Sequence, residues 1–147
     1  MHIEKNVCEN IINTLLCIDG KSKDNLNSRL ELQALNIRSD LHLVELEVED
    51  KFYLPPAPYE MNVAQQRLFC GVFKGARFPY GLAADIRGNV HVKERKIIGL
   101  KSHDNHILMQ HLLPLAVRRL LPKKVSATLI RASNFFKQIY SHVISVS

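Results

Sequence analysis

The end of the chain carries its most regular apolar pattern, which strongly limits the folds the chain can adopt. Steps of four and three residues there place side chains on one narrow seam of an α-helix. The 147-residue chain has no Trp and only 7% aromatic residues, so its core must be built mainly from Leu, Ile and Val. We therefore expect one mainly α-helical globular unit. The seam residues are Val125, Leu129, Ala132, Phe136, Ile139 and Val143.

Shorter helices are predicted from apolar spacing and capping residues. Asp24 is expected to cap a second helix that forms a hairpin with the first. Asn62 and Gln65 match an N-capping box, and Gly75 would end the helix behind it. Pro114 either kinks the chain or starts a helix. The expected helices cover residues 4–16, 26–35, 63–75, 103–113 and 115–121, and the third should bury Ala64, Leu68, Phe69, Val72 and Phe73.

A small β-hairpin is predicted around residues 43–54. Val44, Leu46 and Val48 alternate with glutamates, which is typical of a half-buried strand, and residues 52–54 would pair back onto it. The fold is thus mainly α, and α+β at most. Prolines make residues 55–61 a linker between two regions, residues 1–54 and the helical residues 62–147. For residues 76–99 we predict only a loop with at most a short helix.

The charge of the chain is divided between its two halves. Residues 1–86 contain nine Lys and Arg against twelve Asp and Glu, whereas residues 87–147 contain eleven against two. A cationic surface attracts DNA, RNA or anionic lipid through phosphate contacts without reading sequence. A solvated helix face is the alternative. The candidate nucleic-acid contacts are Arg118, Arg119, Lys123, Lys124, Arg131 and Lys137.

The cysteines and the apolar segments favour an intracellular protein. Cys8, Cys17 and Cys70 are odd in number and lack the spacing of a disulfide framework or a metal knuckle, so we expect reduced thiols. The longest apolar stretch, residues 107–117, is too short to span a bilayer. We therefore expect neither secretion nor membrane insertion.

Three stretches resemble plant CACTA (En/Spm-like) transposases. Residues 1–11, MHIEKNVCENI, and 20–25, GKSKDN, are similar to the end of the Tnp2-type catalytic domain. Residues 99–106, GLKSHDNH, with 112–118 and 121–125, resemble the start of the plant domain of unknown function that follows it. Asn105 stands where that family usually has Cys, and residues 57–98 depart from its pattern.

The resemblance implies an ancestral role in DNA transposition, in the nucleus. Such transposases cut DNA with three acidic residues and two divalent metal ions, which stabilise the attacking and leaving oxygens. In the family an acidic residue precedes the Met-His pair, so of that motif only His2 is present here. We therefore expect a truncated copy with no catalytic residues, no metal site and no cofactor of its own. Divalent metal would be needed only by an intact parent transposase.

Several motif residues have both a structural and a chemical interpretation. For Glu4 and Glu9 we favour a structural role near a helix start over catalysis. His103 and His106, with Asp104 between them, have the spacing of metal ligands or of a proton-transfer pair. His111 would lie on another face, and Asp104 is well explained as a capping residue. We favour structure here too, with a family-specific polar site or a metal site as the alternatives.

The expected partners are DNA and protein. The basic residues support only non-specific phosphate contact, because Phe135 and Phe136 are expected in the core rather than stacked on bases. The chain could alternatively be a domesticated helical module. Its last helix would then offer the apolar seam to a second copy or to a partner protein.

Overall fold

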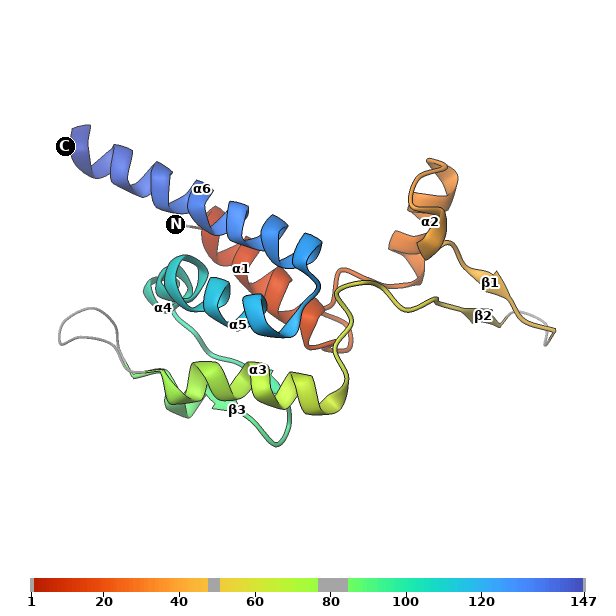
Figure 1. Ribbon diagram of the computed structural model, residues 1–147, viewed down its shortest axis with the longest axis horizontal. Coiled ribbons are helices and arrows are strands. Elements are labelled where there is room, and N and C mark those ends of the chain that lie inside the picture. The colour runs from red at the N-terminus through yellow and green to blue at the C-terminus, as the bar shows by residue number, and fades with distance from the viewer. Residues whose placement is uncertain (1, 48–50, 77–84, 147) are drawn as a thin grey trace.

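A computed structural model describes residues 2–47, 51–76 and 85–146, with only the backbone of His2 and residues 141–146. The fold is mainly helical, as predicted, with two small antiparallel strand pairs. Figure 1 shows α6 (Lys123–Val146) packed over α5 (Leu113–Leu120), with α3 (Val63–Gly75) on the opposite side of α5. Helix α1 (His2–Leu15) lies against α4 (Ser102–Ile107), so the two ends of the sequence share one body.

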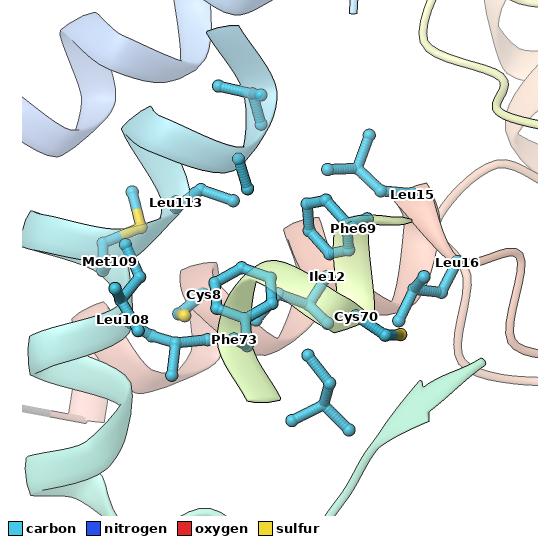
Figure 2. Close-up of a cluster of buried hydrophobic side chains, with 14 of the residues drawn as sticks. Cys8, Ile12, Leu15, Leu16, Phe69, Cys70, Phe73, Leu108, Met109 and Leu113 are labelled. Carbon is cyan, nitrogen blue, oxygen red and sulfur yellow. The ribbon is translucent and has the colours of Figure 1, made fainter. Parts of the chain in front are cut away.

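One hydrophobic core joins α1, α3 and the α4–α5 segment (Figure 2). The rings of Phe69 and Phe73 meet edge to face at 4.8 Å, and both are fully buried. Cys8 and Ile12 of α1 pack toward them together with Leu108. The core therefore includes residues from both sides of the proline-rich segment 55–61.

Helices α4 and α5 are joined by a π-helical turn, Leu108–Leu112. Pro114 follows in the first turn of α5 and has no N–H, so the carbonyl of Gln110 four residues earlier lacks its α-helical donor. The hydroxyl of Ser133, fully buried on α6, donates to that Gln110 oxygen at 3.2 Å. Pro114 thus starts α5, which was the second of the two predicted alternatives, and the next helix supplies the donor for Gln110.

Helix α3 begins as the sequence predicts. The Asn62 side chain accepts the backbone N–H of Gln65, and the Gln65 side chain accepts that of Asn62. The helix also ends at Gly75, but its buried face is rotated from the one we expected. Phe69 and Phe73 are buried, whereas Ala64 is exposed and Leu68 is 62% exposed.

Residues 21–47 and 51–56 form an arm that projects from the body (Figure 1). Helix α2 (Leu26–Ala34) packs on a 3-10 turn, Ser39–Leu41, and stands apart from α1, so the predicted α1–α2 hairpin is wrong. Its N-cap is Asn25, not Asp24. The predicted β-hairpin is present as β1 (Val44–Glu45) and β2 (Phe52–Tyr53), but its residues are exposed rather than half-buried, and Val48 lies outside the described residues.

A buried arginine holds this arm together. The Arg29 guanidinium donates to both carboxylate oxygens of Asp24, at 2.6 and 2.9 Å, and to the carbonyls of Leu41 and Pro55, at 3.1 and 2.8 Å. Asp24 is therefore an ion-pair partner rather than a helix cap. Arg29 brings together three segments of the arm.

A second hairpin was not predicted. After a 3-10 turn, Arg87–Asn89, strand β3 (Val90–His91) pairs antiparallel with β4 (Lys96–Ile97). These strands have only two residues each, too few to show alternation in sequence. Of the loop expected at residues 76–99, residues 77–84 lie outside the described part of the chain.

The seam of α6 packs mostly on the molecule itself. Phe136 is buried and Val125, Leu129 and Ala132 are half-buried against the core, whereas Ile139 is 41% exposed. The side chain of Val143 lies outside the described part of the chain. Among the described residues, no helix combines the length and apolar character needed to cross a bilayer.

Candidate functional site

A buried polar group that joins distant parts of the chain is centred on Glu4 of α1. Its side chain is 1% exposed. Oε1 lies 2.8 Å from Nδ1 of His106 on α4, and Oε2 accepts Nε2 of Gln110 at 2.9 Å. We call these three residues the Glu4 cluster. More than one hundred residues of chain separate Glu4 from its two partners.

The geometry assigns the His106 tautomer. A carboxylate only accepts hydrogen bonds, so His106 must carry a proton on Nδ1 to satisfy Glu4. The 3.0 Å contact between His106 Nδ1 and Gln110 Nε2 is then a close approach of two donors that bind different oxygens of the same carboxylate. The rings of Tyr140 of α6 and His106 meet edge to face, with their centroids 4.5 Å apart. Burial, and then the nearby Glu4 carboxylate, raise the pKa of Tyr140.

The residues around His106 serve α4 itself. Asp104 accepts the backbone N–H of Lys101 at 3.0 Å, which is the capping role predicted for it. Asn105 is fully buried and donates from Nδ2 to the Lys101 carbonyl, while its Oδ1 has no partner among the described residues. His103 is exposed, with its ring stacked 6.4 Å from that of His106. His2 begins α1, and only its backbone is described.

The chemistry of the Glu4 cluster is that of an orienting contact. Both Glu4 oxygens are occupied, and Cys8, one turn later in α1, is a poor nucleophile because burial, followed by the charge of Glu4, raises its pKa. Within the described ranges, no three His, Cys, Asp or Glu side chains gather as ligands for a metal ion. The Glu4 cluster therefore holds α1 against α4.

A second candidate site is the turn between α5 and α6. Arg118 and Arg119 end α5, and Lys123 and Lys124 begin α6. All four side chains are exposed, and none forms an ion pair with an acidic residue in the portion of the chain that the structure describes. We call these four residues the α5–α6 corner.

The other two predicted contacts differ in position. Arg131 is exposed seven residues after Lys124, two helical turns, so both lie on the same face of α6. Lys137 is about 120° around the helix from Arg131. It lies near His111, whose pKa is lowered by burial and then by the charge of Lys137. Lys137 is thus separate from the other basic residues.

The two aromatic residues Phe135 and Phe136 of α6 also differ in exposure. Phe136 is buried as predicted, but Phe135 is 57% exposed, so the expectation that it joins the core is wrong. It follows Arg131 by four residues and therefore lies on the exposed cationic face of α6.

Sequence reasoning did not find the partners of Glu4. Gln110 and Tyr140 were not singled out, and Glu4 and His106 were considered separately. A polar residue on an otherwise apolar helix face was the available signal, since His106 and Gln110 are four residues apart and flank buried Ile107, Leu108 and Met109. Comparison with protein-family models, curated proteins and solved structures found no match.

Proposed function

We propose that this chain is a non-catalytic, DNA-binding segment of a CACTA-type transposase, and that it holds DNA by phosphate contacts at the α5–α6 corner. The observation that carries the proposal is the charge of α5 and α6. Residues 113–146 contain six Lys and Arg and no Asp or Glu. The four corner cations are exposed and without acidic partners among the described residues, so they are available to an external anion.

Arg131 and Phe135 support the same surface. Arg131 extends the cationic face from Lys124 along α6, and the exposed ring of Phe135 lies beside it. Base edges are read by hydrogen-bonding side chains that enter a groove, whereas contacts from cations to phosphates carry no sequence information. Binding without sequence preference follows, and DNA as the partner makes the nucleus the expected compartment.

The resemblance to transposases gains support from one contact. Glu4 belongs to the stretch 1–11 and His106 to the stretch 99–106, which carry the resemblance to two consecutive domains. Their side chains meet at 2.8 Å in the core. If Glu4 and His106 hold α1 against α4, this structural role accounts for both motif residues without catalysis.

Salt titration of duplex DNA binding tests the proposal. The affinity of the chain for a labelled duplex is measured by fluorescence anisotropy between about 50 and 300 mM salt. Counterion release makes log K fall linearly with log salt, with a slope of about 0.9 for each phosphate contact. Replacing Arg118, Arg119, Lys123 and Lys124 by Gln should weaken binding and lower that slope by about 2 to 4.

A matched variant separates a local surface from total charge. Lys21, Lys51, Arg67 and Lys93 are exposed and lie outside the corner. Replacing these four by Gln removes the same charge and should leave most of the affinity and the slope. Equal losses in both variants, or a slope near zero in the unchanged chain, would refute the corner as the binding site.

Catalysis is tested separately. The purified chain with Mg²⁺ or Mn²⁺ should not nick supercoiled plasmid DNA. Metal-dependent nicking that disappears in Glu4→Gln would make the Glu4 cluster catalytic and would contradict the non-catalytic role proposed here.

A further inference from the structure

A groove of about 740 Å³ lies between the second half of α1 and the start of α6. Its walls are mainly apolar: Ile11 and Leu15 come from α1, and Val125 and Leu129 from α6. Leu15 is buried and the other three are half-buried, so the groove presents apolar side chains to solvent. Surfaces of this kind on one molecule commonly mark binding sites.

The rim of the groove has one sign of charge. Lys23, Arg38, Lys123 and Lys124 line it, and no Asp or Glu of the described residues does. Arg38 is paired with Asp40 at 2.9 Å, whereas the three lysines have no acidic partner within the described ranges. Lys23 is fixed there through its backbone, because its N–H donates to the Thr14 hydroxyl at 2.9 Å.

We propose that this groove binds an acidic amphipathic helix of a partner protein. An apolar trough takes the apolar face of a helix, with anchors spaced at i, i+3, i+4 and i+7. The groove is open to solvent, so its occupant must keep a second face in water. Cations on the rim then select acidic residues flanking the apolar face, because opposite charges across an interface favour the correct partner and disfavour basic ones.

The groove is distinct from the proposed DNA surface in much of its lining. Lys123 and Lys124 belong to both, but Lys23, Arg38 and the apolar walls do not belong to the α5–α6 corner. Failure of peptide binding would therefore not count against DNA binding at the corner, and failure of DNA binding would not count against the peptide site.

Labelled peptides of about 18 residues, five turns of helix, provide the test. One panel has Leu at the helical anchor positions and Glu elsewhere, a second has Lys in place of Glu, and a third has the acidic composition in scrambled order. Binding is measured by fluorescence anisotropy at about 100 mM salt, where screening is moderate. We expect the acidic amphipathic peptides to bind at least about tenfold more tightly than the other two, a factor equal to about 1.4 kcal/mol.

Two variants locate the site. Thr128 is exposed and lines the groove, so Thr128→Trp should fill it and weaken the acidic peptides about tenfold. Asn134→Trp adds the same ring at an exposed position of α6 outside the groove and should leave affinity unchanged. Lys23→Glu should weaken the same peptides without altering duplex DNA binding.

Three results would overturn the proposal. They are equal binding of acidic, basic and scrambled peptides, equal effects of Thr128→Trp and Asn134→Trp, or an unchanged affinity in Lys23→Glu. Binding of dodecanoate to the groove without any peptide affinity would assign it to small anionic amphiphiles instead.

Discussion

At the scale of single residues, two buried polar contacts connect distant segments of the chain. Glu4 fastens α1 to α4 through His106 and Gln110, and Arg29 fastens the start of the arm to its 3-10 turn and to Pro55 near its end. A buried polar group is stable only while its partners are present. These contacts therefore specify which segments meet, more than they add to stability.

Removing the Glu4 side chain should lower the stability of the fold, because its buried partners lose their acceptor. Glu4→Ala leaves the His106 Nδ1–H and one Gln110 N–H without their acceptor in a buried site, so we expect the free energy of unfolding to fall by about 2 kcal/mol. Urea unfolding followed by circular dichroism measures it. Glu9→Ala is the control, because the one ion pair of Glu9 within the described residues is with Lys5, at 3.9 Å on the surface, and its loss should change stability by less than about 0.5 kcal/mol.

The Asp24–Arg29 ion pair makes the arm sensitive to acid. Hydrogen bonding from Arg29, and to a lesser degree from Tyr59, holds the pKa of Asp24 below its ordinary value of 3.8. A carboxylate whose pKa is lower in the folded state stabilises that state above its unfolded-state pKa and loses the effect as pH falls through its folded value. Asp24→Asn should therefore cost about 2 kcal/mol above about pH 5, and the cost should shrink below about pH 4.

Unfolding free energies of the wild type and Asp24→Asn are compared from about pH 6 to about pH 3, a range that brackets the loss of carboxylate charge. If the difference stays constant over that range, Asp24 does not owe its effect to ionisation, and the ion pair has been given the wrong role.

At the scale of elements, the π-helical junction between α4 and α5 depends on α6. Pro114 removes the donor that Gln110 O would have in a continuous helix, and the buried Ser133 hydroxyl supplies one. Ser133→Ala should therefore cost about 1 to 2 kcal/mol, since it leaves a buried carbonyl without that donor. Pro114→Ala restores an N–H at the position from which an α-helix would serve that carbonyl.

A double-mutant cycle tests the link. If Ser133 compensates for Pro114, then Ser133→Ala should cost at least about 0.5 kcal/mol less in the Pro114→Ala background than in the wild type. Unfolding in urea gives the four free energies. Strict additivity would mean that the Ser133 hydrogen bond and the proline act independently.

Features of these elements were predicted correctly where the residues that determine them are neighbours in sequence, and were missed where those residues are far apart along the chain. The Asn62–Gln65 capping box and the stop at Gly75 involve neighbours in sequence, and they were predicted correctly. The inward face of α3 depends on where α1 and α5 lie, so Leu68 was wrongly expected to be buried. Asp24 had the composition of a cap, but Arg29 competes for its carboxylate through tertiary structure. His106 and Gln110 on an apolar helix face indicated a buried polar group, but nothing local identified Glu4, 102 residues away, as its partner.

At the scale of the whole molecule, stability is concentrated in the helical body. The core joins α1, α3, α5 and α6 and holds the large fully buried side chains, including Phe69 and Met109. The arm, by contrast, exposes much of its apolar surface, as Leu35 at 69% illustrates. Arg29 is the one buried residue of α2. Local opening is cheapest where few apolar contacts are buried.

Native-state hydrogen exchange should therefore separate the two regions. Amides of α2 should exchange faster than those of α3 and α5, because opening the arm leaves the core intact, whereas freeing α3 requires global unfolding. Mass spectrometry of peptic peptides measures both. Arg29→Met should speed exchange in the arm, because it removes hydrogen bonds to Asp24, Leu41 and Pro55, and should leave α3 and α5 nearly unchanged. Equal protection of arm and body, or equal loss in both on Arg29→Met, would show that they unfold as one cooperative unit.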